Sequence, residues 1–174
     1  MTKIIFSGFG GQGVLTLGQL VSTMAMNKGY NVTWLPSYGA EMRGGTANCS
    51  VVISEESIGS PLFARPDILV AFNRPSIDKF LPRVAPGGRV LVNSSIVNLD
   101  EVPAGLSLHK TDASNISAAL GSLKVQNMVM LGAFMKLVPM FTLEDAEALI
   151  NEKFGAKYPG MVGLNIAAVK KGME

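Results

Sequence analysis

Cysteine, histidine and charge are all scarce in this chain of 174 residues. Cys49 and His109 are the sole residues of their types. They cannot supply an internal disulfide, a tetrahedral zinc site or an iron–sulfur cluster, because a cluster alone needs about four thiolates. Charged residues make up 16% of the chain, against about 25% in ordinary soluble domains. Any redox metal that the protein serves is therefore expected on another chain.

Long apolar runs are missing as well. The longest, residues 128–135, is followed at once by Lys136, whereas a membrane span needs about 18 or more apolar residues in succession. Residues 1–7 lack the charged, apolar and small-residue segments of a secretory signal, so we expect a cytoplasmic protein. The net charge of +2 comes from scattered side chains, which does not suggest nucleic-acid binding. Neither a membrane nor a nucleic acid is expected as a partner.

Apolar residues, by contrast, are abundant. Hydrophobic residues make up 48% of the chain, and ten of its residues are methionine. A large core explains this composition, and so does burial against partner subunits or a second copy of the chain. A chain of 174 residues suits one domain, and no linker, repeat or low-complexity tract divides it. We therefore expect a single domain over residues 1–174.

The hydrophobic pattern alternates between strand and helix periods. Strands are expected at residues 3–7, 31–35, 46–54, 67–72, 89–93 and 106–109, with Pro36 ending the second. Helices are expected at residues 14–25, 75–81, 127–137, 143–154 and 163–171, together with a short one capped by Ser114 or Asn115. Residues 127–137 are apolar on nearly every side and fit a helix buried by its own domain or by a neighbour. This order predicts an α/β fold, a single Rossmann-like three-layer domain with a mostly parallel sheet.

Glycines cluster where the first strand meets the first helix. Gly8, Gly10 and Gly13 have the spacing of a dinucleotide-binding loop, with Gly11 and Gln12 between them. Glycines allow a tight turn and the close approach of a phosphate to backbone N–H groups at the helix N-terminus. The loop is therefore a candidate anion site, and its alternative is a tight strand-to-helix turn with no ligand.

The acidic residue of an NAD site is absent. An Asp or Glu is expected at the end of the second strand, about 20 residues past the glycines, where this chain has Leu35, Pro36 and Ser37. Ser37 with Arg43 would suit the 2′-phosphate of NADP instead. A free-standing NADP-binding reductase is therefore an alternative function, although 174 residues leave little room for a substrate domain.

A second candidate site lies between the second and third strands. Its residues are Ser37, Tyr38, Glu41, Arg43, Gly44 and Gly45. A guanidinium beside two glycines can bind a carboxylate or phosphate through charge and backbone together. The alternative is a bulged hairpin in which Arg43 and Glu41 form a surface ion pair.

Asn73 follows the fourth expected strand, at the sheet edge where open α/β folds bind ligands. It is therefore a candidate ligand residue, and its alternative role is to start the next helix. Cys49 lies midway along a strand and is expected to be an inert core thiol. His109 has no evident acid–base partner, and no nucleophile, base and orienting acid occur together. The sequence thus offers binding residues and no catalytic residue.

Three segments together resemble the gamma subunit of 2-oxoacid:ferredoxin oxidoreductases: residues 8–13, residues 34–50 and the Asn73-Arg74-Pro75-Ser76 segment. The resemblance covers nearly the whole chain and is most specific over residues 34–53. Ala40 departs from it, because many relatives have a proline there that would stiffen the loop. The sequence of this loop is more similar to the 2-oxoglutarate and branched-chain (ketoisovalerate) types than to the pyruvate type.

The resemblance implies a multisubunit cytoplasmic enzyme. It would decarboxylate a 2-oxoacid on thiamine diphosphate with Mg, pass electrons through iron–sulfur clusters to ferredoxin and transfer the acyl group to coenzyme A. In that family the thiamine cofactor lies between the alpha and beta subunits, and the clusters lie on beta and on a ferredoxin-like delta subunit. The gamma chain would be inactive alone, and the resemblance assigns none of these cofactors to it by itself. It would help the subunits to assemble and would help to form the coenzyme A region.

The sequence therefore leaves three possible functions: a non-catalytic subunit of such an oxidoreductase, an NADP-binding reductase, and an assembly scaffold with an empty glycine loop. Binding of coenzyme A, of NADPH or of neither by the purified chain distinguishes them.

Overall fold

The computed structural model of the protein describes residues 1–37 and 46–174. Within these residues six strands form one sheet in the order β2-β3-β1-β4-β5-β6. Strands β1, β4, β5 and β6 are parallel neighbours, while β3 is antiparallel to both β1 and β2. The strands are β1 (Thr2–Phe9), β2 (Asn31–Ser37), β3 (Thr46–Ser54), β4 (Ile68–Ala71), β5 (Arg89–Asn93) and β6 (Ser107–Thr111). The sheet is thus mostly parallel, as expected.

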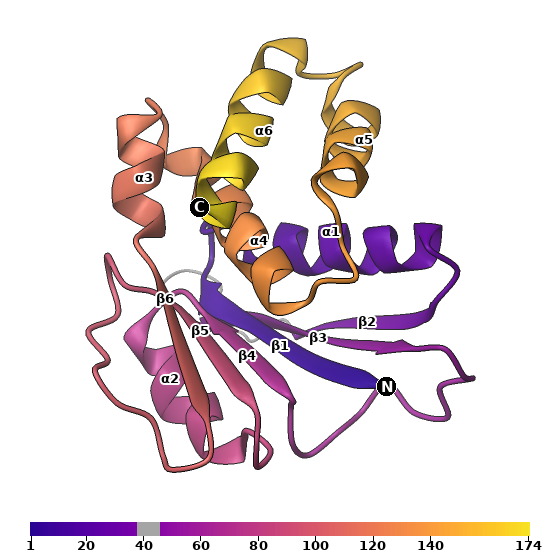
Figure 1. Ribbon diagram of the computed structural model, residues 1–174, viewed down its shortest axis with the longest axis vertical. Helices are drawn as coiled ribbons and strands as arrows, with labels where there is room; N and C mark the ends of the chain where they lie inside the picture. The colour runs from indigo at the N-terminus through magenta and orange to yellow at the C-terminus, as the bar shows by residue number, and fades with distance from the viewer. Residues whose placement is uncertain (38–45) are drawn as a thin grey trace.

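Helices cover both faces of the sheet, but unequally. Figure 1 shows α2 on one face and α1, α3, α4, α5 and α6 on the other, which confirms the three-layer α/β class. The helices are α1 (Val14–Asn27), α2 (Arg74–Phe80), α3 (Ala113–Ala119), α4 (Gln126–Leu137), α5 (Leu143–Phe154) and α6 (Pro159–Met173), with short 3-10 turns η1 (Leu81–Arg83) and η2 (Leu123–Val125). Among the described helices, none is long and apolar enough to cross a membrane.

The position of strand β3 makes the strand order differ from that of a Rossmann fold. In that fold the strand after the first helix lies beside the first strand. Here β3 lies between β1 and β2, pairing Phe6 with Cys49 on one side and Pro36 with Cys49 on the other. The end of β2 is therefore two strands away from the end of β1, about 10 Å at the usual strand spacing.

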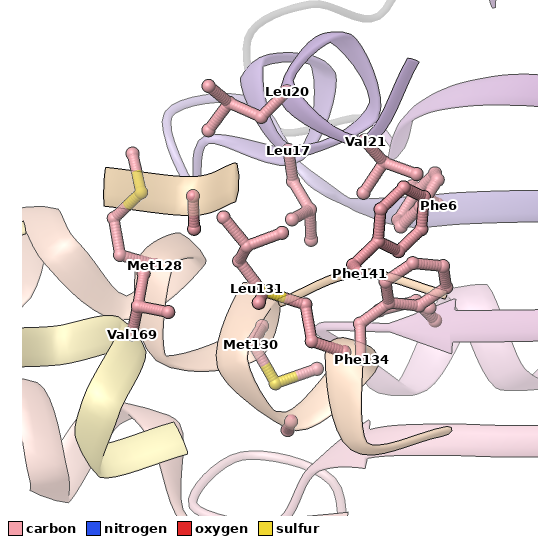
Figure 2. Packing of buried hydrophobic residues seen from close by; sticks show 14 of the residues in the cluster. Phe6, Leu17, Leu20, Val21, Met128, Met130, Leu131, Phe134, Phe141 and Val169 are labelled. Carbon is pink, nitrogen blue, oxygen red and sulfur yellow. The ribbon is translucent and has the colours of Figure 1, made fainter. Parts of the chain in front are cut away.

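The larger of two hydrophobic clusters lies between the sheet and the five-helix layer (Figure 2). The ring centroids of Phe6 and Phe134 are 5.5 Å apart, and those of Phe134 and Phe141 are 6.2 Å apart. Leu17 and Val21 of α1 join this cluster. The smaller cluster, on the α2 side, is built on Ile5, Leu69, Val90 and neighbouring residues. Strands β1, β4 and β5 thus alternate their side chains between two cores, as the part of a sheet that is covered on both faces requires.

Helix α4 is the centre of the helical layer. Its residues from Asn127 to Met135 are all buried by the chain itself, so the alternative that this helix is buried by a neighbouring subunit is not needed. Gly132 meets α6 so closely that an added Cβ would lie 2.0 Å from the Val169 carbonyl oxygen. Gly172 is equally tight, because its Cβ would lie 1.9 Å from the Val129 carbonyl oxygen. Glycine at both positions lets the two helix backbones touch.

Several boundaries differ from the expected ones by one to four residues. Strand β2 continues through Pro36, because β2 is an edge strand and an edge tolerates a missing N–H. Helix α3 begins after Asp112, not at Ser114 or Asn115; the Ser95 hydroxyl accepts hydrogen bonds from the Ser114 and Asn115 amides, at 3.0 and 3.3 Å. Strand β6 ends at Thr111 and α6 begins at Pro159. These boundaries depend on contacts with distant parts of the chain or lie at helix and strand ends, which sequence patterns predict least well.

Candidate functional site

The glycine loop turns the chain from β1 into α1. Gly8 lies inside β1, not in the loop, and a Cβ there would lie 2.8 Å from the Phe72 Cβ. The Gln12 amide donates to the Phe9 carbonyl at 3.2 Å, and the Phe9 amide donates to the Gln12 side-chain oxygen at 2.6 Å. Gly11 and Gly13 have φ angles of 91° and 76°, a region that side chains disfavour. Gln12 and these two glycines together fix the shape of the turn.

The N-terminus of α1 is open to an anion. Gly13 is its N-cap and supplies no side-chain cap, and the first turn contains no acidic residue. The first helical hydrogen bond runs from the Leu17 amide to the Gly13 carbonyl at 2.9 Å. The amides of Val14, Leu15 and Thr16 precede that bond, so they are donors without a helical acceptor. Their alignment with the helix dipole favours negative charge at this point.

Asn127 of α4 supports the loop from the helical layer. Its side-chain amide donates to the Gly13 carbonyl at 3.4 Å, and it is 6% exposed. A Cβ at Gly13 would lie 2.6 Å from this amide nitrogen. Glycine at position 13 is thus required by its φ angle and by Asn127 together, and the sequence pattern alone did not identify Asn127.

Asn73 forms a buried polar cluster after β4. Its side-chain oxygen Oδ1 accepts hydrogen bonds from the Ser76 backbone amide at 2.9 Å and from the Ser76 hydroxyl at 2.6 Å. The Ser76 hydroxyl also lies 2.7 Å from the Ser7 hydroxyl of β1. The remaining Asn73 group, its side-chain NH2, is buried and has no hydrogen-bond partner among the described residues. A fully buried amide of this kind calls for an explanation, because leaving it unpaired costs about 1–3 kcal/mol.

The fold brings the glycine loop and Asn73 to one place. Strands β1 and β4 are parallel neighbours, and the Phe72 amide donates to the Ser7 carbonyl at 2.8 Å. Helix α1, which follows β1, packs on one face, whereas α2, which follows β4, packs on the other (Figure 1). Such a change of face marks a topological switch point, where open α/β sheets bind ligands outside the carboxyl ends of their strands. We call residues 7–16 and 72–76 the switch point.

The second predicted loop is described only at its ends. Tyr38, Glu41, Arg43, Gly44 and Gly45 lie outside the described residues. Ser37 pairs with Asn48, and Asn48 pairs with Ser7, so Ser37 reaches the same edge of the sheet as the switch point but two strands away from it. The predicted NADP site loses its geometric basis, because the second strand of a dinucleotide fold must lie beside the first.

A polar network that the sequence analysis missed follows β5. The Asn93 side-chain amide donates to the Ser114 hydroxyl at 2.9 Å, and its oxygen accepts from the Ser95 amide at 3.3 Å. The signal was present in the sequence, since Asn73 and Asn93 each follow a short, buried, apolar strand. Two neighbouring parallel strands therefore each have a buried asparagine at the ligand edge: Asn93 is the last residue of β5, and Asn73 lies two residues after β4.

The described residues favour binding over catalysis. Cys49 is buried, as expected of a core thiol, and burial raises its pKa to about 12. Burial, and then the positive charge of Arg89, lower the pKa of His109. Among the described residues no three His, Cys, Asp or Glu side chains gather as metal ligands. A cavity of about 450 Å³ lies at the amino end of β1, lined by Tyr30, Glu55 and others, and none of the predicted site residues lines it.

Comparison with known proteins agrees with this geometry. The family described as "Pyruvate ferredoxin/flavodoxin oxidoreductase" matches residues 3–174. Ketoisovalerate oxidoreductase subunit VorA of Methanothermobacter thermautotrophicus is 41% identical over 135 residues, which cover 78% of this chain and 28% of that protein. 2-Oxoglutarate synthase subunit KorC of Methanocaldococcus jannaschii is 34% identical over 175 residues, covering 99% of this chain and 92% of that one. The chain thus spans under a third of VorA and nearly all of KorC.

Two solved structures share the fold. The gamma subunit of a keto/oxoacid ferredoxin oxidoreductase from Geobacter sulfurreducens superposes with a TM-score of 0.82 and 29% identity, covering 99% of this chain and 96% of that one. The 2-oxoglutarate:ferredoxin oxidoreductase of Magnetococcus marinus, solved with 2-oxoglutarate, coenzyme A and succinyl-CoA, has a TM-score of 0.89 and 25% identity. This chain is covered to 99% and that one to 30%. None of these matches is described as an NADP-dependent reductase.

Proposed function

The chain belongs to the pyruvate ferredoxin/flavodoxin oxidoreductase family, and on that premise we propose that it is the gamma subunit of a 2-oxoacid:ferredoxin oxidoreductase. Residues 1–174 form one gamma-type domain of a cytoplasmic complex with alpha, beta and ferredoxin-like delta subunits. The complex decarboxylates a 2-oxoacid oxidatively, forms an acyl-CoA and reduces ferredoxin. The gamma chain is inactive by itself and contributes a binding surface.

One observation carries the proposed role: the glycine loop and the unpaired Asn73 amide lie at one switch point. Backbone amides at the start of α1 suit phosphate oxygens, and the Asn73 NH2 needs an acceptor. The diphosphate of coenzyme A offers such acceptors together with negative charge. Gly10, Gly11, Gln12, Gly13 and Asn73 are therefore the proposed coenzyme A residues of the described chain, and Ser37 lies at the same edge of the sheet, two strands away from them.

The undescribed part of the candidate site belongs to the same proposal. Arg43 and Glu41, with Tyr38, Gly44 and Gly45, connect Ser37 to Thr46, and Thr46 pairs with Phe9 beside the glycine loop. We propose that the Arg43 guanidinium binds a coenzyme A phosphate or a carboxylate of a neighbouring subunit. A planar two-donor group suits either anion.

The other cofactors of the complex do not fit the residues of this chain. Cys49 is the single cysteine and is buried, whereas an iron–sulfur cluster needs about four thiolates. Thiamine diphosphate with Mg supplies the electron sink for decarboxylation, and we assign it and the clusters to the other subunits. What the gamma chain does is to hold and orient the acyl acceptor.

The test is calorimetric titration of the purified chain and of the assembled complex with coenzyme A and with NADPH. Thr16→Glu adds a carboxylate to the first turn of α1, where it stabilises the helix but repels a phosphate. We expect coenzyme A binding to weaken at least tenfold, since two like charges about 5 Å apart repel by more than 1.4 kcal/mol even at an effective dielectric constant of about 20. Gln19→Glu, one turn further along α1, adds the same charge as a control.

The outcomes separate the three functions. Coenzyme A binding that Thr16→Glu weakens and Gln19→Glu does not supports the proposal. NADPH binding without coenzyme A binding supports a reductase. If neither molecule binds to the chain or to the complex, the glycine loop is empty and the chain is an assembly scaffold.

A further inference from the structure

Two buried serine hydroxyls hold the Asn73 side chain in one orientation. Ser7 of β1, Asn73 and Ser76 of α2 are each 0% exposed. The Ser76 hydroxyl lies 2.6 Å from Oδ1 of Asn73 and 2.7 Å from the Ser7 hydroxyl. Because Oδ1 can only accept, the single Ser76 hydroxyl hydrogen is used on Asn73, and Ser7 is the donor in the second bond. The three side chains thus form a directed series of hydrogen bonds that ends on Asn73.

This series fixes which end of the Asn73 amide faces α2. Oδ1 accepts from the Ser76 backbone amide as well, at 2.9 Å. If the Asn73 amide were turned over, its NH2 group would face that N–H group, and two donors would oppose each other. Ser76 supplies both donors that Oδ1 accepts, so Ser76 determines where the NH2 group of Asn73 lies.

The start of α2 explains the oxygen of Asn73 but not its nitrogen. Asn73 is the N-cap of α2, and a cap needs one oxygen acceptor, which Asp or Ser supplies about as well. The NH2 group has no partner among the described residues, and a buried donor without an acceptor destabilises a fold. Helix capping by itself therefore does not favour asparagine at this position.

Asn93, at the carboxyl end of the neighbouring strand β5, provides a contrast. It is also 0% exposed, but its NH2 group donates to the Ser114 hydroxyl at 2.9 Å and its side-chain oxygen accepts from the Ser95 amide at 3.3 Å. Both ends of the Asn93 amide are thus used within the fold. At Asn73 the oxygen alone is used, and the NH2 group is left for an acceptor that the described residues do not supply.

The position of Asn73 in the sheet indicates what that acceptor is. Ser7 pairs with Ala71, and the Phe72 amide donates to the Ser7 carbonyl at 2.8 Å, so Asn73 follows β4 beside the end of β1 and the glycine loop. The first turn of α1 at this loop has no side-chain cap and no acidic residue. The α1 terminus and the Asn73 NH2 group are both hydrogen-bond donors, which suit a ligand that carries oxygen acceptors.

We propose that Ser76, supported by Ser7, is a positioning residue that presents the Asn73 NH2 group as a fixed donor to a phosphate or carbonyl oxygen of coenzyme A. The proposal rests on the proposed function, which names the ligand, and it adds the role of the two serines. Each serine acts through Asn73 and not by contact with the ligand. A donor that is already fixed loses less entropy on binding than a mobile one.

The test measures the affinity of the purified chain and of the assembled complex for coenzyme A and for inorganic diphosphate by calorimetry. Asn73→Ser keeps an oxygen that can cap α2 and removes the NH2 group. Asn93→Ser makes the same change at the end of the neighbouring strand and is the matched control. Ser76→Ala is measured alone and together with Asn73→Ser. The melting temperature of each variant reports on its folding.

We expect Asn73→Ser to weaken coenzyme A binding about tenfold, the loss of one hydrogen bond to a ligand oxygen, with little change in melting temperature. Asn93→Ser should do the reverse: it should lower the melting temperature, because it breaks bonds within the fold, and leave the affinity within about twofold. Ser76→Ala should weaken binding about fivefold in the chain with Asn73 and less than about twofold in the chain with Asn73→Ser. A merely structural serine would not lose its effect in this way.

Unchanged coenzyme A affinity in Asn73→Ser overturns the proposal and assigns the NH2 group to the fold itself. An equal loss of affinity in Asn93→Ser overturns it too, because the loss would then reflect a general loosening of the sheet edge. Equal effects of Ser76→Ala in both backgrounds show that Ser76 does not act through Asn73, which also overturns it.

Inorganic diphosphate identifies the acceptor and separates this proposal from the proposed function. If Asn73→Ser weakens the binding of both probes, the acceptor is a phosphate oxygen; if it weakens coenzyme A alone, the acceptor is a carbonyl of the pantetheine arm. Both results support the proposal. If the unchanged protein binds diphosphate but not coenzyme A, and Asn73→Ser weakens that binding, the donor role of Asn73 stands while the proposed function fails. If neither probe binds, both fail.

Discussion

The backbone contact between α4 and α6 predicts opposite changes in the free energy of unfolding when alanine replaces Gly132, at the contact, and Gly163, away from it. Gly132→Ala places a methyl group 2.0 Å from the Val169 carbonyl oxygen. A carbon and an oxygen atom in contact lie about 3.3 Å or more apart, so the helices must separate by about 1.3 Å. The obstacle is backbone, which cannot rotate aside as a flexible side chain can.

The expected loss of stability follows from two opposed effects. Overpacking of a well-filled core costs about 1–3 kcal/mol, and more where the structure yields little. Alanine regains about 1 kcal/mol of helix propensity over glycine. A backbone clash calls for the upper part of the overpacking range, so we expect a net destabilisation of about 1–2 kcal/mol, or a fall of about 2–8 °C in Tm for a chain of this size.

Gly163→Ala is the matched control, because it makes the same change within α6. A Cβ there meets nothing within 4 Å, so only the propensity gain remains. We expect the free energy of unfolding to rise by about 0.5–1 kcal/mol. Urea unfolding followed by helical circular dichroism and by the fluorescence of Trp34, the single tryptophan, measures both variants.

Gly132→Ala with a free energy of unfolding equal to or above that of the unchanged chain would refute the packing argument. An equal loss at Gly163 would refute it too, because the loss would then not depend on contact with the opposite helix. A crystal structure of Gly132→Ala with unchanged helix spacing would show that the clash relaxes elsewhere.

Three further predictions concern single side chains. Thr142→Ala removes one half of the capping box with Asp145 at the start of α5 and should lower the free energy of unfolding in urea by about 1 kcal/mol; a loss below about 0.5 kcal/mol, the usual scatter of surface changes, would contradict it. Cys49, with a thiol pKa of about 12, should not react with a disulfide reagent at neutral pH until urea unfolds the chain; rapid reaction of the folded chain would show that the thiol is accessible. The lowered pKa of His109 means that the unfolded chain binds this proton more readily, so stability should fall as the pH drops below about 6.5, and His109→Gln should reduce that fall; an identical pH profile would exclude His109 as its source.

The sequence by itself determined the local features. Short apolar runs and the glycine loop each depend on residues a few positions apart, and dihedral preferences and hydrophobic periodicity act over that range. The α/β class and the scarcity of metal ligands follow from composition and element order. The one cysteine also predicted that no cluster would be held by this chain alone.

Only the tertiary structure decided which of these parts meet. Strand β3 lies between β1 and β2, and no local pattern encodes that order, because strand pairing depends on burial and hydrogen bonding summed over distant segments. The same folding places Asn73 near the glycine loop and Asn127 in contact with Gly13. It also places Gly132 and Gly172 where α4 and α6 cross. In the sequence these glycines look like ordinary breaks in a helical pattern, since what excludes a side chain there is the backbone of a segment about 40 residues away.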